Sequence, residues 1–143
     1  SYKMSNLGAK LILDALDLIE NNKVNFVPQN HKEATYAKKI KKTESKINWN
    51  LTAKNIVAQI NAFNPNPGSW FNLKGSRIKI IKALEVNENG LPGEIINKNF
   101  TIGCSKNAVQ VLELQKEGKN KITSKEFLKG NKLDVGSNIL TNV

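Results

Sequence analysis

The sequence predicts a mainly β protein with helices, in which an amphipathic helix, a basic linker and a second helix precede a small closed antiparallel β-barrel. Three observations support this fold class. Apolar residues recur at helical spacing before residue 64, whereas segments with a period of two follow residue 68. Two prolines and a glycine stand between these patterns. The later segments are short, five or six in about 75 residues, which is typical of a small barrel.

The first helix is expected to run from residue 5 to about residue 22, with Ser5 as its N-cap. Charged residues occupy its other faces, and its apolar positions at helical spacing are Leu7, Leu11, Ile12, Ala15, Leu16 and Ile19. Such an apolar face needs a partner, either within this chain or in another part of a longer protein.

Residues 25–50 are poor in core-forming side chains, so we expect an extended, lysine-rich linker that Trp49 anchors at its far end. The second helix is expected over residues 52–63, with Thr52 as a cap. Pro65 and Pro67 then fix φ and turn the residues before them toward extended geometry, while the next glycine allows the backbone to reverse. This corner ends the helix and directs the first strand.

Strands are expected at residues 70–73, 77–86, 93–96, 101–104 and 108–115. In the second of these, Ile78 and Ile80 share a face but Ile81 does not, which predicts a β-bulge of the kind that small barrels use. A short helix is expected over residues 124–129, and residues 139–140 add a last short strand.

The composition limits the possible functions. A length of 143 residues allows one main domain, and no apolar stretch approaches the roughly 20 residues that a membrane helix needs. The single Cys104 excludes a disulfide within the chain and is expected to be a small core residue, while His31 lies far from it in the linker. Neither a metal-ligand cluster nor a phosphate-binding glycine loop occurs, so we expect no catalytic or metal-binding residues in this chain.

The formal net charge of +10 is unevenly distributed. Residues 1–37 hold four lysines and four acidic residues, so the whole excess lies in residues 38–143. Coding bias explains part of the lysine content, but it would enrich lysine in both regions. The asymmetry favours a polyanionic partner, for which RNA is the obvious candidate.

Two runs, residues 38–46 and 116–132, each carry a net charge of +4. They either line one RNA-binding surface or are simply solvated. Arg77 and Lys79 share the outward face of the second predicted strand, and they are open to the same two interpretations. Because Arg77 is the single arginine, such a surface is expected to supply affinity and positioning rather than base recognition.

Large aromatic residues flank the corner. Trp49, Trp70 and Phe71 would be able to stack on bases if they were exposed. Aromatic side chains beside a proline corner are more often part of the core, which is the interpretation we prefer for all three.

The corner also carries a resemblance to a known family. Residues 63–68, FNPNPG, closely resemble the FNPxPG motif that opens the C-terminal domain of methionyl-tRNA formyltransferases, although many members have Trp at the position of Asn66. Upstream, Gln29, ATYAKKI and KINWN resemble the interdomain linker of this family, and LQKEGKNKITSKEFLKG resembles its closing segment. The resemblance covers essentially the whole chain.

The resemblance implies an organisation and a role. Residues 1–27 would be the last helix of the catalytic domain, 28–48 the basic linker, and 49–143 an OB-like tRNA-binding domain. The formyl donor 10-formyltetrahydrofolate would bind in the catalytic domain, whose motifs do not occur here. The partners would be initiator Met-tRNA and that catalytic domain, in a monomeric cytoplasmic enzyme. The expected tRNA-binding residues are Lys38, Lys39, Lys41, Lys42, Lys46, Arg77, Lys79, Lys119 and Lys121.

Two alternatives remain open at this point. The chain is also compatible with the barrel of a paralogous formyltransferase that acts on a small molecule such as a sugar nucleotide, in which case the lysines mainly confer solubility. A stand-alone OB-like module that binds single-stranded nucleic acid is the other alternative.

Overall fold

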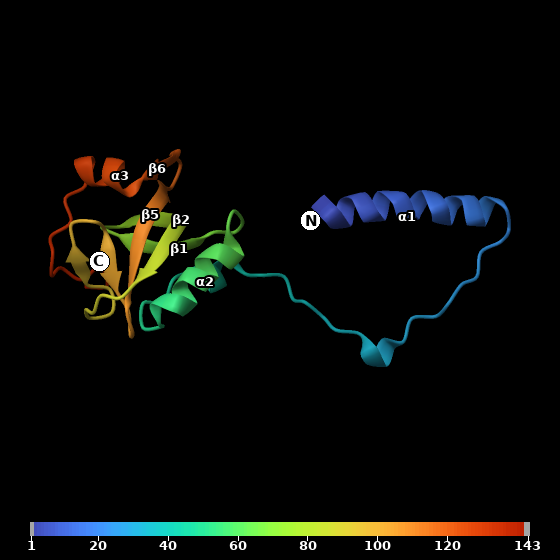
Figure 1. Cartoon of the computed structure of the whole chain (residues 1–143), viewed down its shortest axis with the longest axis horizontal. Helices are drawn as coiled ribbons and strands as arrows, with labels where there is room; N and C mark the ends of the chain where they lie inside the picture. Colours follow the sequence, from blue (N-terminus) through green and yellow to red (C-terminus); the bar gives the residue numbers. More distant parts are fainter. Residues whose placement is uncertain (1, 142–143) are drawn as a thin grey trace. The chain divides into compact units, whose positions relative to one another are not determined.

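The computed structural model describes residues 2–141. The chain divides into two compact units, Ser1–Lys38 and Lys39–Val143. Figure 1 draws the chain coloured along its sequence, from blue at the N-terminus to red at the C-terminus. Residues 39–48, which the sequence places in the linker, belong to the second unit.

The first unit contains α1 (Tyr2–Glu20) and a 3₁₀ turn, η1 (His31–Glu33). None of the residues of α1 is buried, and its apolar face is exposed. Helix α1 begins before Ser5, so the prediction that Ser5 caps it is wrong. The helix ends near the predicted position, where the Asn21 side chain donates to the Asp17 carbonyl.

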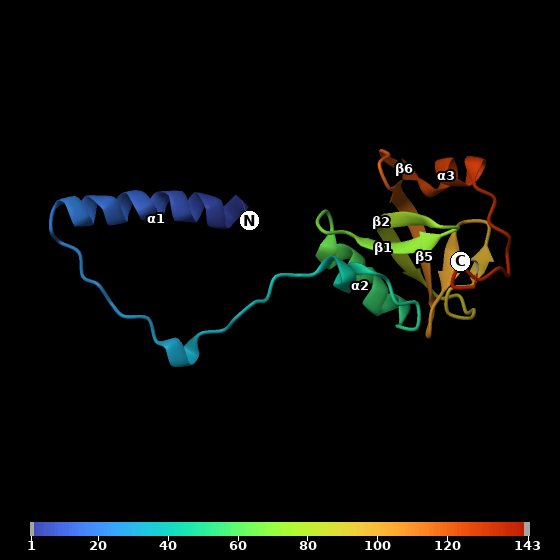
Figure 2. The ribbon, with the colours of Figure 1, turned by 180° about the vertical axis from the view of Figure 1, so that it is seen from behind.

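The second unit holds the remaining elements. These are η2 (Lys42–Ser45), α2 (Ala53–Phe63), β1 (Ser69–Leu73), β2 (Ser76–Val86), β3 (Ile95–Asn97), β4 (Thr101–Gly103), β5 (Ala108–Lys116), β6 (Lys121–Thr123) and α3 (Ser124–Gly130). Helix α2 packs against β1, β2 and β5, whereas α3 lies beside β5 and β6 at the other end of the strands (Figures 1 and 2).

The six strands form one antiparallel sheet in the order β1-β2-β5-β4-β3, with β6 also paired to β5. The mixed helix and sheet architecture is therefore as predicted. The closed barrel is not shown, because no ladder joins β1 to β3 within residues 2–141.

Other parts of the chain cover both outer edges of the sheet. Lys46 forms a parallel bridge with Trp70 of β1, and Asn138 forms an antiparallel bridge with Glu94 beside β3. The predicted strand at residues 139–140 is wrong, since the isolated bridge is made by Asn138 and residues 139–140 lie in the turn that follows it. A further strand, β6, was not predicted because three residues are too few for an alternating pattern to be recognised.

The predicted bulge and helix cap are confirmed. The register between β2 and β5 shifts between Ile80 and Lys82, on either side of Ile81. The Thr52 hydroxyl accepts a hydrogen bond from the Asn55 amide at 3.3 Å, which caps α2. The Asn64 side chain donates to the Ile81 carbonyl at 3.3 Å, so the corner is tied to the bulge.

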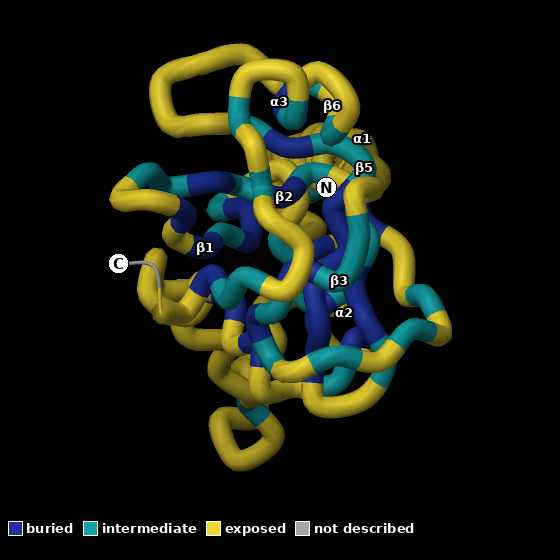
Figure 3. Tube along the Cα trace, turned by 90° about the vertical axis from the view of Figure 1, so that its left-hand side faces the viewer, coloured by how far each residue is buried: buried dark blue, intermediate teal, exposed yellow. Residues whose placement is uncertain are grey.

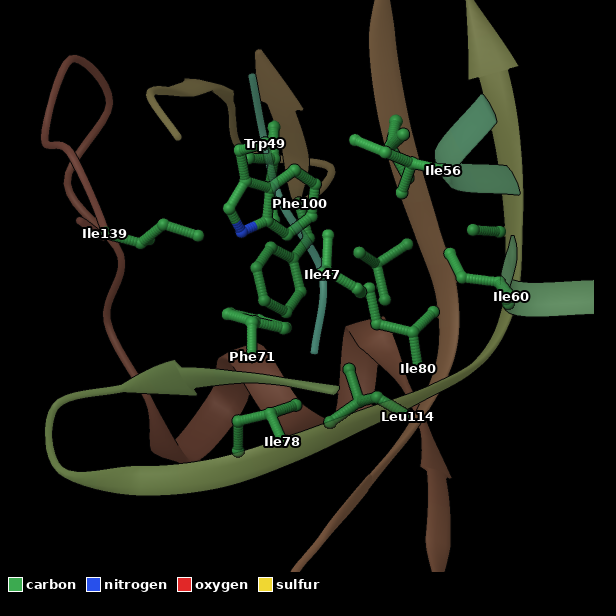
Figure 4. Packing of buried hydrophobic residues seen from close by; sticks show 14 of the residues in the cluster. Ile47, Trp49, Ile56, Ile60, Phe71, Ile78, Ile80, Phe100, Leu114 and Ile139 are labelled. Carbon is green, nitrogen blue, oxygen red and sulfur yellow. The ribbon is translucent and has the colours of Figure 1, made fainter. Parts of the chain in front are cut away.

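Apolar side chains from the sheet, α2, α3 and the segments around Trp49 and Ile139 converge in one core (Figure 4). The buried stretches follow the strands, whereas the turns are exposed (Figure 3). Trp49 contacts Phe71 edge to face at 5.5 Å between ring centroids, and Phe100 stacks on Phe127 at 5.6 Å. The predicted core positions of Trp49 and Phe71 are confirmed.

Candidate nucleic-acid interface

A basic hollow of about 360 Å³ lies on the second unit, where the corner, the start of β2 and the end of β5 meet. We call it the basic hollow. Its lining residues are Lys42, Asn66, Pro67, Arg77, Lys79, Gln115, Lys116, Glu117 and Gly118. Residues from both basic runs therefore meet residues from the predicted basic face of β2.

The corner and β2 fit closely at one side of the basic hollow. Gly68 has a φ of +79°, and a Cβ at this position would lie only 2.5 Å from Cδ of Lys79. Glycine therefore suits the backbone conformation, and the aliphatic stem of Lys79 occupies the space that a Cβ would take. Lys79 lines the hollow together with Asn66 and Pro67 of the corner.

Trp70 connects β1 to the basic residues. Cζ of Arg77 lies 4.2 Å from the centroid of the Trp70 ring, and Nζ of Lys46 lies 5.7 Å from it. The indole N–H donates to the Lys42 carbonyl at 3.3 Å. Trp70 is only half-buried, so the prediction that it belongs to the core is wrong; its ring instead supports cations.

Three hydrogen bonds hold the segment around η2 on the sheet and on α2, and a fourth lies within η2 itself. The Ile47 amide donates to the Trp70 carbonyl at 2.7 Å, and the hydroxyl of the buried Ser45 donates to the Lys42 carbonyl at 2.8 Å. The Gln59 side chain donates to the carbonyls of Glu44 and Lys46 at 3.2 and 3.4 Å. These bonds position the lysines of the first basic run.

The charges of the basic hollow are unbalanced. Lys42, Arg77, Lys79 and Lys116 line it, and Glu117 is the one acidic lining residue. In the part of the chain that the structure describes, the one salt bridge joins Lys121 to Glu113 at 3.7 Å. Like charges gathered without paired carboxylates repel one another and attract an anion.

The structure brings together three of the predicted site residues, Lys42, Arg77 and Lys79. Lys46 lies nearby over Trp70. Lys121 is paired with Glu113, and Lys119, whose carbonyl accepts from the Gln115 side chain, lies in the turn after β5. The other predicted residues do not line the hollow: Lys39 and Lys41 precede η2, and Lys38 belongs to the first unit.

Sequence reasoning missed Lys116, Asn66 and Gln115 as site residues. Lys116 belongs to the second basic run, and its position at the end of a predicted strand was the available signal. The two amides carry no comparable signal, because asparagine and glutamine are ordinary in turns and on exposed strand faces.

Outside the hollow, Cys104 is buried, and burial raises the pKa of its thiol to about 11. This confirms the prediction of a core cysteine rather than a reactive one. His31 is exposed in η1. Within residues 2–141 no group of three or more His, Cys, Asp or Glu side chains is placed to hold a metal ion, and no helix is both long and apolar enough to cross a membrane.

Comparison with known proteins identifies the class to which this fold and this surface belong. Residues 39–132 match the family model described as the formyl transferase, C-terminal domain, so the chain belongs to this family. The matched region is almost the whole second unit and includes every residue that lines the basic hollow.

Among curated proteins, the chain is similar to methionyl-tRNA formyltransferases. It is 37% identical to that of Pelagibacter ubique over 144 residues, which covers 100% of the chain and 46% of the relative. It is 40% identical to that of Dictyoglomus turgidum, covering 95% of the chain and again 46% of the relative. The chain thus spans less than half the length of these curated relatives.

Among solved structures, the fold is similar to part of HypX from Aquifex aeolicus, crystallised in complex with tetrahydrofolic acid. The TM-score is 0.61 at 24% identity, and the match covers 88% of the chain but 24% of HypX. At this level of identity the similarity concerns the fold alone.

Proposed function

We propose that this chain is the C-terminal, tRNA-binding part of a methionyl-tRNA formyltransferase. It holds initiator Met-tRNA so that the amino group of the attached methionine reaches 10-formyltetrahydrofolate in the catalytic part of the protein, in the cytoplasm. Such positioning lowers the entropic barrier to formyl transfer. The formyl donor and the catalytic residues are assigned to the region of the relatives that this chain does not match, and no reaction step is assigned to this chain.

The observation that carries the proposal is the convergence of four cations around one hollow. Three segments that are far apart in sequence supply Lys42, Arg77 with Lys79, and Lys116, yet these residues line a single depression with one carboxylate among them. Lysine binds phosphate as a point charge and carries no base specificity. A surface of this kind suits the phosphate backbone of a folded RNA, and the similarity to enzymes named for methionyl-tRNA points to tRNA.

The organisation follows the same proposal. Residues 1–27 are assigned to the last helix of the catalytic domain, so that its exposed apolar face packs on that domain in the whole protein. The tRNA then contacts the linker as well as the basic hollow. We also propose that the sheet of the second unit forms an OB-like barrel.

The test is a titration of the whole chain with initiator tRNA and with a single-stranded RNA of matched length, at two salt concentrations. A triple variant, Lys42→Ala, Lys79→Ala and Lys116→Ala, is compared with Lys54→Ala, Lys98→Ala and Lys106→Ala, whose lysines do not line the hollow. Both variants lose the same charge. The hollow variant is expected to weaken tRNA binding at least tenfold and to reduce the slope of log K against log salt by about three.

The outcomes separate the alternatives. Salt-sensitive preference for tRNA, lost in the hollow variant, supports the proposal. Equal affinity for both RNAs favours a general single-strand binder. Equal losses in both triple variants would mean that net charge alone matters, and no binding to either RNA would favour a formyltransferase that acts on a small molecule.

A further inference from the structure

Arg77 is the one arginine among the 22 basic residues of this chain. In a sequence this rich in lysine, any need for positive charge alone is met by lysine. The position that is not lysine lies in the basic hollow, with its guanidinium 4.2 Å from the centre of the Trp70 ring. This placement suggests that planar geometry, and not only charge, is needed there.

The contact with Trp70 leaves the N–H groups of the guanidinium available. Arg77 lies over the ring face, and a cation–π contact of this kind uses the charge of the guanidinium rather than its five N–H donors. Within residues 2–141 the Arg77 side chain forms no salt bridge and donates no hydrogen bond to the protein. Its fork of donors therefore has no protein partner.

The surroundings fit a phosphate group. Lys42, Lys79 and Lys116 line the same hollow and supply point charges around the fork. The stem of Lys79 lies against Gly68, and the Lys42 carbonyl accepts a hydrogen bond from the indole N–H of Trp70. The volume of about 360 Å³ is at the small end for a ligand site and admits a phosphate with part of its sugars.

We propose that the basic hollow binds a single phosphodiester of the RNA backbone, with Arg77 donating two hydrogen bonds to two of its oxygens. Trp70 acts as a positioning residue that holds the guanidinium over its ring and fixes the segment carrying Lys42. The inference rests on the proposed function, since it names which part of the RNA this surface takes. It also sets Arg77 apart from the lysines, whose contribution depends on charge alone.

The decisive variant is Arg77→Lys, because it keeps the charge and removes the fork. We expect tRNA affinity to fall roughly tenfold, as for loss of one charge-assisted hydrogen bond, while the salt slope stays unchanged. Trp70→Leu is expected to cause a similar loss, and the double variant to be no weaker than either single variant. Lys98→Arg, at a lysine that does not line the hollow, is the matched control and should bind within twofold of the unaltered chain.

A second measurement reports on geometry directly. Since the chain has one arginine, its Nε–H gives a single assignable signal in ¹⁵N NMR spectra. Addition of an RNA trinucleotide is expected to shift this signal in the unaltered chain, whereas in Trp70→Leu the shift is reduced severalfold. Unfolding midpoints of all variants establish that they are folded.

The inference and the proposed function fail in different ways. If Arg77→Lys binds tRNA like the unaltered chain and the Nε–H signal does not move, Arg77 is one more point charge and the inference is overturned, while tRNA binding stands. If the unaltered chain itself binds no RNA, the proposed function fails together with the inference.

Discussion

Helices α1 and α2 have similar amphipathic patterns but opposite surroundings. Helix α2 buries Ala53, Ile56 and Ile60 against the sheet, whereas α1 buries no residue. The first unit is also almost neutral, so nine of the ten net positive charges belong to the second unit. The comparison teaches that an apolar helical face shows the need for a partner but not whether the same chain supplies it.

The largest expected effect comes from making the same substitution in each of the two helices and comparing the stability of the variants. Ile56→Ala removes a fully buried side chain from α2, so we expect the free energy of unfolding of the second unit to fall by about 2–5 kcal/mol. Ile12→Ala makes the same change in α1, where the side chain is 55% exposed, and should leave this value unchanged. Tryptophan fluorescence in a denaturant titration measures the free energy of unfolding of the second unit, because both tryptophans lie in that unit. Equal losses in the two variants would contradict the division into units.

A smaller effect concerns the buried thiol of the second unit. The pKa of Cys104 is raised from 9.0 to about 11, so between these values the unfolded chain loses the proton before the folded one does. Stability contributed by the neutral thiol is complete below pH 9 and is lost toward pH 11, in total roughly 2–3 kcal/mol. Unfolding measured from pH 8 to 11 should therefore decline more steeply for the unaltered chain than for Cys104→Ala. Parallel curves would mean that the thiol is not buried in solution.

An effect of about 1 kcal/mol is expected within the second unit, near its first residues. Gln59→Ala removes the side chain that donates to the carbonyls of Glu44 and Lys46. We expect a lower unfolding midpoint and faster hydrogen exchange of the Ile47 amide, while Asn55→Ala on the exposed face of α2 serves as the control. Unchanged exchange at Ile47 would show that the segment is held by its other contacts.

The smallest expected effect is that of removing the first unit. A chain of residues 39–143 should unfold at the same midpoint as the whole chain, because α1 and the segment after it contribute no residue to the core. Thermal unfolding, monitored by tryptophan fluorescence, compares the unfolding midpoints of the two chains. A midpoint lowered by several degrees would mean that the first unit packs on the second.

Much of the second unit was predictable because local signals agreed there. Thr52 caps α2, the prolines end the helix, and the phase change at Ile81 marks the bulge. These features depend on residues close in sequence. The ends of the chain were less predictable: Ser5 is an ordinary helical residue, and residues 139–140 had apolar character but no ladder.

The candidate site was only partly predictable, because it depends on contacts between distant segments. Charge runs identified Lys42, and strand periodicity identified Arg77 and Lys79. The contacts of Trp70 with Arg77 and with the Lys42 carbonyl depend on tertiary packing. The sequence shows only an aromatic residue beside a proline corner and gives no sign of these contacts. Long-range electrostatic neighbours of this kind are specified by the fold as a whole.

The coverage of the sheet edges has a consequence for behaviour at high concentration. A bare β1 would offer its backbone to a strand from another molecule, which is a common route to aggregation. Instead, Ile47 donates to Trp70 on that edge, and Ile139 donates to Gly93 beside β3. The segment that carries the first lysines therefore also blocks edge-to-edge association, and the charge it brings repels a second copy of the same molecule.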